Sequence, residues 1–256
     1  MTVYFIGAGP GDPELLTLKA ARLIGACPVC LYAGSLVPEE VVGCAPDGAR
    51  ILDTAPMTLQ DTHAEIVAAH ERGEDVARVH SGDPSLYGAI AEQIRLLKAE
   101  GIAYEIIPGV PAYAAAAAAL GTELTVPEVA QSIILTRMSM KSTGMPEGET
   151  LANFGATGAT LAIHLGIRAL REVIRQLVPH YGEDCPVVVV YRASWPDQLI
   201  LRGTFADIFS KVRAAKVTRT ALILVGPALS ENHGFPDSAL YDPAKPHVLR
   251  PVAKGA

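Results

Sequence analysis

The chain has 256 residues and half of them are hydrophobic, enough to bury the core of one large domain or of two modest ones. Its formal net charge of −6 at pH 7 disfavours nucleic acid as the main partner, because phosphate binding needs a basic face. No stretch approaches the ~18 consecutive apolar residues of a membrane span, and the first residues lack the basic segment of a signal peptide, so we expect a cytoplasmic protein that binds no membrane.

Short apolar runs alternate with amphipathic helical patterns in the first half of the chain, which is typical of βαβ units. The apolar runs are brief, as buried parallel strands are. We predict strands at residues 3–7, 28–32, 51–53, 76–80 and 104–107, and helices at residues 15–24, 38–44, 59–72, 87–100 and 111–120.

The second half begins a new series after residues 121–123. The turn signal Trp195-Pro196-Asp197 precedes an apolar run, which indicates a hairpin and a sheet of mixed direction. Residues 138–149 are polar and suit a mobile loop. We predict strands at residues 132–136, 161–165, 187–191, 199–201 and 221–225, and helices at residues 169–178 and 205–214.

These patterns predict an α/β protein with two domains. The first, residues 1–118, should hold a largely parallel sheet, and the second, residues 119–240, a mixed sheet. Residues 241–256 should form an irregular tail.

A glycine-rich loop, GAGPGDP at residues 7–13, follows the first predicted strand, where ligands bind in open α/β sheets. It is not a dinucleotide fingerprint, because Asp12 stands where the third glycine is required. It is not a Walker loop either, since Lys19 does not follow a glycine. A tight structural turn is the alternative explanation.

Three further motifs stand out, and the first two are loops that share this placement. SGDPSLYG at residues 81–88 combines a glycine that allows close approach with the carboxylate of Asp83, which a helix N-cap would also explain. PGVPA at residues 108–112 opens an alanine-rich helix, and TALILVG at residues 220–226 is a strand with a polar start.

The four motifs, in this order, resemble those of the class III tetrapyrrole methyltransferases, which use S-adenosylmethionine. The resemblance runs from about residue 3 to residue 226. It implies two αβα domains, the cofactor in the cleft between them, a homodimer, and a tetrapyrrole intermediate of cobalamin synthesis as the substrate. Residues 31–37, LYAGSLV, lack the aspartate that uroporphyrinogen methyltransferases carry in this loop.

The resemblance also implies site residues. Cofactor contacts are expected from Pro10, Ser81, Gly82, Asp83, Leu86, Pro111, Ala112, Leu165, Ala193, Thr220 and Ala221. Substrate contacts are expected from Ser35, Arg137 and Lys141. Pro111 departs from the Thr of uroporphyrinogen methyltransferases and removes a hydroxyl and an N–H from that position.

Several alternatives stay open. Arg137 and Lys141 either grip substrate carboxylates or are solvated loop charges. His164 on an apolar strand is more readily a core histidine than a base. The substrate could be another tetrapyrrole, with or without cobalt, or a protein or RNA, and a binding protein without turnover is the alternative from another class.

Catalysis needs no dedicated nucleophile, and the sequence shows no Ser/His/Asp or Cys/His pairing. The Cys27-Pro28-Val29-Cys30 spacing is more consistent with buried small residues than with a redox pair. No metal site is expected, although Asp61, His63, Glu65 and His70 share a predicted helix.

Overall fold

The computed structural model describes residues 1–34, 36–138, 144–230, 234–235, 237–238 and 245. It divides into two compact units. The first unit comprises Met1–Ala119 together with Arg192–Leu199, and the second comprises Leu120–Tyr191 and the chain from Ile200 onward. A short segment of the second half of the sequence therefore packs with the first half.

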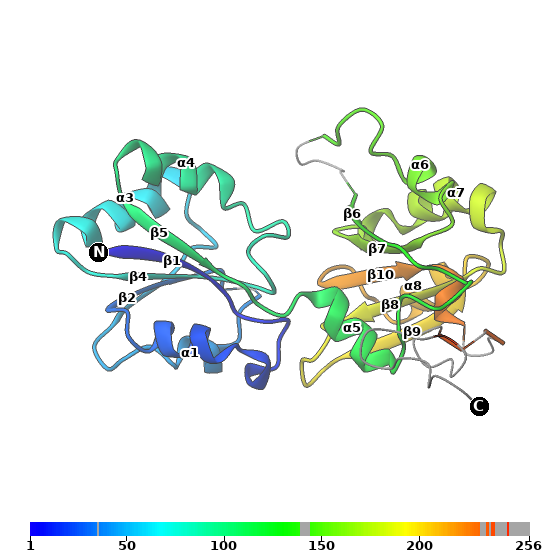
Figure 1. Ribbon diagram of the computed structural model, residues 1–256, viewed down its shortest axis with the longest axis horizontal. Coiled ribbons are helices and arrows are strands. Elements are labelled where there is room, and N and C mark those ends of the chain that lie inside the picture. Colours follow the sequence, from blue (N-terminus) through cyan, green and yellow to red (C-terminus); the bar gives the residue numbers. More distant parts are fainter. Residues whose placement is uncertain (35, 139–143, 231–233, 236, 239–244, 246–256) are drawn as a thin grey trace, which may run out of the picture. The chain divides into compact units, whose positions relative to one another are not determined.

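The first unit is built on a parallel sheet of five strands, in the order β3-β2-β4-β1-β5 (Figure 1). The strands are β1 (Thr2–Gly7), β2 (Val29–Tyr32), β3 (Arg50–Asp53), β4 (Val76–His80) and β5 (Ala103–Ile107). The helices are α1 (Leu18–Ile24), α2 (Glu39–Val42), α3 (Leu59–Glu71), α4 (Ala91–Ala99) and α5 (Ala112–Leu120), preceded by a 3₁₀ turn at Pro13–Leu15.

Alternation along the strands gives this sheet two buried faces. Val3 and Phe5 of β1 pack in one cluster with side chains of α3 and α4, whereas Ile6 packs with α1 and α2. Because all five strands are parallel, their carboxyl ends lie at one edge, and the loops after β1, β4 and β5 meet there.

Side-chain caps explain where some of the helices begin. The Thr17 hydroxyl accepts a hydrogen bond from the amide of Ala20, and Thr58 with Asp61 forms a capping box at the start of α3. The prediction of a helix from residue 87 was wrong, because α4 begins at Ala91. Tyr87 and Ala89 adopt φ angles of 57° and 50°, in the left-handed region that a right-handed helix excludes.

The second unit contains a mixed sheet in the order β6-β7-β10-β8-β9. β6 and β7 are parallel, while β10 runs antiparallel to both of its neighbours. The strands are β6 (Ile133–Arg137), β7 (Thr160–His164), β8 (Pro186–Tyr191), β9 (Leu199–Thr204) and β10 (Ala221–Val225). The helices are α6 (Leu151–Gly155), α7 (Leu170–Tyr181) and α8 (Ile208–Ala214), with 3₁₀ turns at Ile167–Ala169 and Pro227–Leu229.

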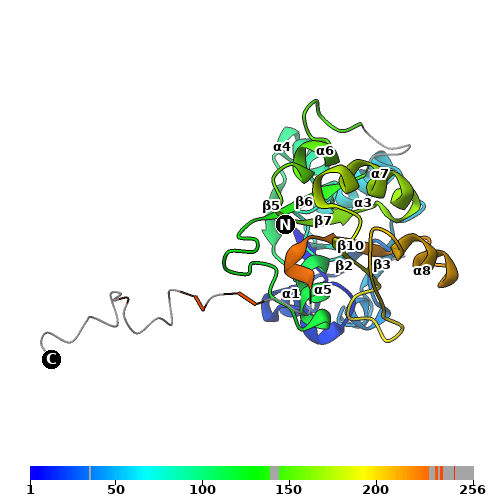
Figure 2. The same cartoon turned by 90° about the vertical axis from the view of Figure 1, so that its right-hand side faces the viewer.

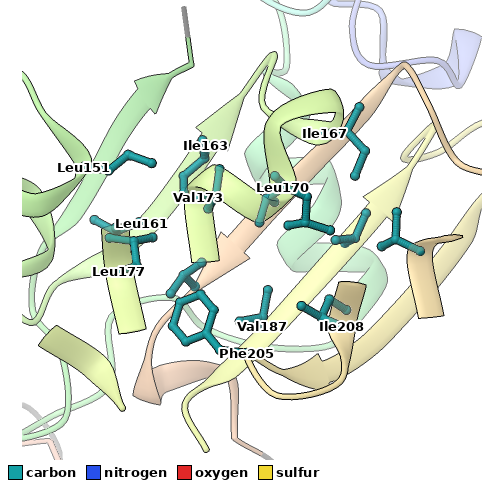
Figure 3. Close-up of a cluster of buried hydrophobic side chains, with 14 of the residues drawn as sticks. Leu151, Leu161, Ile163, Ile167, Leu170, Val173, Leu177, Val187, Phe205 and Ile208 are labelled. Atoms are coloured by element: carbon teal, nitrogen blue, oxygen red, sulfur yellow. The ribbon is translucent and has the colours of Figure 1, made fainter. Parts of the chain in front are cut away.

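One face of this sheet carries the core of the second unit. Leu161 and Ile163 of β7 pack with Leu170 and Leu177 of α7 and with Ile208 of α8 (Figure 3). α6, which was not predicted from the sequence, lies beside α7 (Figure 2). The prediction of an α/β fold with a parallel first sheet and a mixed second sheet is confirmed.

Candidate functional site

Three loops of the first unit pack backbone against backbone at the carboxyl edge of its sheet. They are the Gly-rich loop (residues 7–13), the SGDP loop (residues 81–84) and the PGVPA loop (residues 108–112). A Cβ on Gly109 would lie 2.2 Å from the carbonyl oxygen of Gly82, and one on Gly7 would lie 2.6 Å from the Cα of Gly109. Only glycine permits this approach, so the glycines seen in the sequence build the junction itself.

Backbone hydrogen bonds fix the junction. The amide of Gly82 donates to the carbonyl of Gly9 at 2.7 Å, and the amide of Gly9 donates back to Gly82 at 3.3 Å. The amide of Ala8 donates to the carbonyl of His80 at 2.7 Å. Gly9 and Gly82 have φ angles of 74° and 64°, conformations that side chains disfavour.

The carboxylate of Asp83 is fully engaged within these loops. One oxygen accepts hydrogen bonds from the amide, at 2.8 Å, and the hydroxyl of Ser85, and the other accepts from the amide of Gly109 at 2.9 Å. Burial acts to raise the pKa of Asp83, but the bonds from Ser85 and Gly109 outweigh it, and the net pKa lies below its usual value. Asp83 therefore joins two loops and is poorly suited to act as a base.

The charge of these loops discriminates between ligands. The Gly-rich, SGDP and PGVPA loops contain no lysine or arginine, and they carry Asp12 and Asp83. These three loops offer no cationic side chain of their own to a phosphate, whose binding relies on positive partners. Their two carboxylates are compatible with a ligand that carries a positive centre, such as the sulfonium of S-adenosylmethionine.

The second unit presents a second set of strained residues. β6, β7 and β8 end at the edge where β10 begins, since Arg137 pairs with His164 and Ala221 pairs with Tyr191. At this edge Leu165 and Thr220 have φ angles of 53° and 54°. Leu165 is also 64% exposed. Strained, exposed residues of this kind concentrate at functional sites.

The structure thus sorts the residues predicted to contact the cofactor or substrate into two groups. The first unit contains Pro10, Ser81, Gly82, Asp83, Leu86, Pro111, Ala112 and Ala193, and the second contains Arg137, Leu165, Thr220 and Ala221. Ser35 and Lys141 lie outside the described residues.

Arg137 was predicted to lie in a loop, and that prediction was wrong. It is the last residue of β6, paired in register with His164 of β7. His164 itself is half-buried, and burial lowers its pKa.

Two buried polar side chains lie on β4 beneath the SGDP loop. Arg78 is 7% exposed, and its guanidinium donates to the side chain of Gln93 at 3.1 Å and to the carbonyl of Leu31 at 3.3 Å. His80 is 5% exposed, and no described residue forms a hydrogen bond with its Nε2. Burial, with the nearby charge of Arg78, lowers the pKa of His80 to about 3, so this histidine is neutral in the folded protein.

Trp195 is the participant that sequence reasoning missed, because the residue was interpreted only as part of a turn. The indole N–H of Trp195 donates to the carbonyl of Pro10 at 2.8 Å. Its ring occupies the space beside Gly11, where a Cβ would lie 2.1 Å from the indole Cδ1. The only sequence signal was that Trp195 is the single tryptophan of the chain.

Other candidate chemistries find no support in the described part of the chain. It contains no group of three or more metal-ligating side chains. His63 contacts Glu100 at 2.9 Å, across to a neighbouring helix end. None of the helices among these residues is long and apolar enough to cross a bilayer.

Comparison with known proteins gives consistent matches. Residues 2–208 match the family described as tetrapyrrole (corrin/porphyrin) methylases. A precorrin-4 C(11)-methyltransferase of a Sinorhizobium species is 59% identical, over 95% of this chain and 96% of its own. A cobalt precorrin-4 methyltransferase structure aligns with a TM-score of 0.87 and 42% identity, covering 90% of this chain and 96% of its own. The structure of a uroporphyrin-III C-methyltransferase of Thermus thermophilus, complexed with S-adenosylhomocysteine, aligns with a TM-score of 0.73 and 29% identity. The alignment covers 90% of this chain and 99% of that one.

Proposed function

The chain belongs to the tetrapyrrole methylase family, and on that premise we propose that it is a precorrin-4 C11-methyltransferase of cobalamin synthesis. It transfers a methyl group from S-adenosylmethionine to C11 of precorrin-4. The observation that carries this proposal is the 59% identity, over nearly the full length of both chains, to a protein with that activity in its name. The sequence LYAGSLV at residues 31–37 also resembles the corresponding loop of precorrin-4 C11-methyltransferases, an expectation that comes from the family resemblance.

S-adenosylmethionine supplies an electrophilic methyl group on a positively charged sulfur. When bound, it would donate this methyl group to a ring carbon, and its sulfur would keep the electron pair of the carbon–sulfur bond. The residues of this chain have to bind and align the reactants. Positioning of this kind lowers barriers by about 7–11 kcal/mol.

The rigid junction of the first unit is suited to that task. The bonds between Gly9 and Gly82 and between Asp83 and Gly109 join the three loops to one another. We assign cofactor contacts to Pro10 and to Ser81–Asp83 on these loops, and to Leu165 and Thr220 on the second unit. That the cofactor lies between the two domains stays a prediction from the resemblance.

No side chain of the three loops is prepared to remove a proton. Asp83 has a lowered pKa and holds hydrogen bonds from Ser85 and Gly109. Neighbouring His80 is buried, with a pKa of about 3. The three loops therefore contribute alignment, and we assign no base among their side chains.

A cobalt-containing substrate is the second candidate, favoured by the structural match to a cobalt precorrin-4 methyltransferase. Identity to that protein is lower, 42% against 59% for the enzyme named for the metal-free substrate. The test compares turnover of metal-free and cobalt-containing precorrin-4 by the same protein. We expect a higher kcat/KM for the metal-free substrate. A higher value with cobalt would favour the second candidate, and turnover of neither would leave a binding protein without catalysis.

We propose further that the enzyme works as a homodimer in the cytoplasm. Both expectations come from the sequence and its family resemblance. Sedimentation of the purified protein tests the first, and a monomer at micromolar concentration would contradict it.

A further inference from the structure

We propose that Trp195 is a positioning residue that holds the Gly-rich loop in its cofactor-binding conformation. This inference rests on the proposed function, because it assigns a role toward the S-adenosylmethionine of that reaction. Trp195 belongs to a segment, residues 192–198, that connects β8 to β9 and packs with the first unit although β8 lies in the second.

Two polar contacts join this segment to the Gly-rich loop. The indole N–H of Trp195 donates to the Pro10 carbonyl at 2.8 Å. The amide of Asp12 donates to the Ser194 hydroxyl at 2.9 Å. These contacts flank Gly11 on both sides, and they satisfy backbone groups that the loop, being neither helix nor strand, does not pair internally.

The indole also fills the position of a missing side chain. A Cβ on Gly11 would lie 2.1 Å from the indole Cδ1 and 2.3 Å from its Nε1. Glycine at this position therefore lets the ring lie directly against the backbone, and the ring in turn limits how far the loop can move. At its other end the loop is fixed by the hydrogen bonds between Gly9 and Gly82.

The ring is itself held by its own segment. The guanidinium carbon of Arg192 lies 4.0 Å from the centre of the indole ring, and Arg192 pairs with Asp197 at 2.7 Å. The amide of Ser194 donates to the side chain of Gln198 at 2.8 Å. Arg192 and Ser194 have φ angles of 46° and 68°, strain that this set of contacts retains.

The geometry predicts which kinetic constants change when Trp195 is replaced. Trp195 contacts the backbone of the loop, so its loss should weaken cofactor binding and leave the chemical step intact once cofactor is saturating. Trp195→Phe keeps an aromatic ring and removes the N–H donor. We expect KM for S-adenosylmethionine and Kd for S-adenosylhomocysteine to rise about five- to tenfold, with kcat and the KM for the tetrapyrrole within about twofold.

The chain offers a matched control. Arg171 stacks on Phe209 at 4.4 Å in the second unit, as Arg192 stacks on Trp195 in the first. Arg192→Ala should raise the Kd for S-adenosylhomocysteine, whereas Arg171→Ala should leave it unchanged. Equal effects of the two variants would mean that the loss is a general effect of removing a surface stack.

Because Trp195 is the single tryptophan, its emission reports directly on the loop. In the wild-type protein, S-adenosylhomocysteine should change the emission with the Kd that calorimetry gives. Gly11→Ala should displace the ring and shift the emission to longer wavelength. Adding Trp195→Ala to Gly11→Ala should restore part of the lost stability, because the added methyl group then has room.

The outcomes separate this inference from the proposed function. A folded Trp195→Phe with an unchanged KM for S-adenosylmethionine would overturn the inference alone, as would a wild-type emission that ignores saturating S-adenosylhomocysteine. If the wild-type protein binds no S-adenosylhomocysteine by calorimetry at millimolar concentration, the proposed function fails instead. A rise in KM for the cofactor confined to the variants of the Trp195 segment supports both.

Discussion

The residues of β4 show how burial sets protonation below the candidate site. Arg78 is buried with no carboxylate partner among the described residues, and burial lowers its pKa to about 10, which still leaves it charged at neutral pH. Burial, together with that charge, lowers the pKa of His80 to about 3 and keeps it neutral, although a hydrogen bond to the backbone of Gly88 acts to raise this pKa. The pair supports the loop that begins at Ser81.

This arrangement predicts a pH dependence of stability. In the unfolded chain His80 takes up a proton near the ordinary histidine pKa of 6.5, whereas in the folded protein it does so only near 3. The stability that comes from keeping His80 neutral in the folded protein is therefore fully present above pH 6.5. It is lost as the pH falls toward 3. The loss approaches about 1.4 kcal/mol per pH unit within that window.

His80→Asn tests the assignment. The variant should be less stable at neutral pH, because it leaves a gap, but its free energy of unfolding should fall less steeply between about pH 6 and pH 4. Urea unfolding at several pH values measures both slopes. Parallel slopes for the wild-type protein and the variant would contradict a neutral, buried His80.

The four cysteines differ sharply in their predicted reactivity. Burial raises the pKa of Cys27 to about 12 and those of Cys30 and Cys185 to about 11, whereas Cys44 is exposed. Iodoacetamide at about pH 8 should therefore modify one thiol in the folded protein and four after denaturation, as mass spectrometry counts them. Rapid modification of Cys27 and Cys30 in the folded protein would reopen the redox interpretation of their spacing.

At the scale of elements, the glycine junction is the feature on which the candidate site depends. Gly82 and Gly109 serve it differently. A Cβ on Gly82 would meet no atom closer than 3.8 Å, so the cost there is the φ of 64°. A Cβ on Gly109 would lie 2.2 Å from a backbone oxygen and could not be accommodated without moving the SGDP loop.

Alanine substitutions should separate the backbone strain at Gly82 from the steric overlap at Gly109. Gly82→Ala should lose about 1–2 kcal/mol of stability through backbone strain, and Gly109→Ala about 3 kcal/mol or more. Gly73→Ala is the matched control, because Gly73 has a φ of 70° with nothing within 4 Å. We expect Gly82→Ala to weaken S-adenosylhomocysteine binding and Gly73→Ala, equally strained, to leave it unchanged. A similar affinity in both variants would remove the SGDP loop from the site.

The pattern of apolar residues along the sequence was sufficient to predict the strands. Buried strands appear as short runs of apolar side chains, which can be recognised without the structure. The residues at which helices begin were harder to predict from the sequence. The start of α4 depends on the left-handed conformations of Tyr87 and Ala89, which tertiary contacts impose and which propensity does not encode. Arg137 was misplaced for a related reason, since its pairing with His164 extends β6 by one residue into a polar sequence.

At the scale of the molecule, the sequence motifs marked the Gly-rich, SGDP and PGVPA loops, and the structure brings these three loops together. The roles of their residues stay predictions. Glycine and proline spacing carries that information within a few residues. The link from Trp195 to Pro10 spans 185 residues and has no local pattern, so it became apparent only from the fold. Long-range contacts of this kind are the part of a site that one sequence does not reveal.

Substrate binding gives a prediction at this scale. The tetrapyrrole carries many carboxylates, and Arg137 stands at the edge of the second sheet where Leu165 and Thr220 lie. Arg137→Ala should raise the KM for the tetrapyrrole, with a loss of about 1.5–3 kcal/mol if the contact is desolvated, and should leave the Kd for S-adenosylhomocysteine unchanged. Arg175→Ala, which removes the same charge from α7, is the control.

The rise in the KM for the tetrapyrrole caused by Arg137→Ala should become smaller as salt is added, because screening weakens contacts between charges. An unchanged KM at low salt would mean that Arg137 is a solvated charge and that the carboxylates are bound elsewhere. An equal loss of cofactor affinity would indicate a disturbed second sheet. A calorimetric titration beside the kinetics distinguishes these outcomes.

The central claim is transfer of one methyl group to C11 of precorrin-4, and locating the transferred carbon tests it most directly. The purified protein is incubated with precorrin-4 and S-adenosylmethionine labelled with carbon-13 in its methyl group, and the product is examined by nuclear magnetic resonance. We predict one labelled methyl group, bonded to C11, together with an equal amount of S-adenosylhomocysteine. A label on any other ring carbon, or bound cofactor without transfer, would contradict the claim.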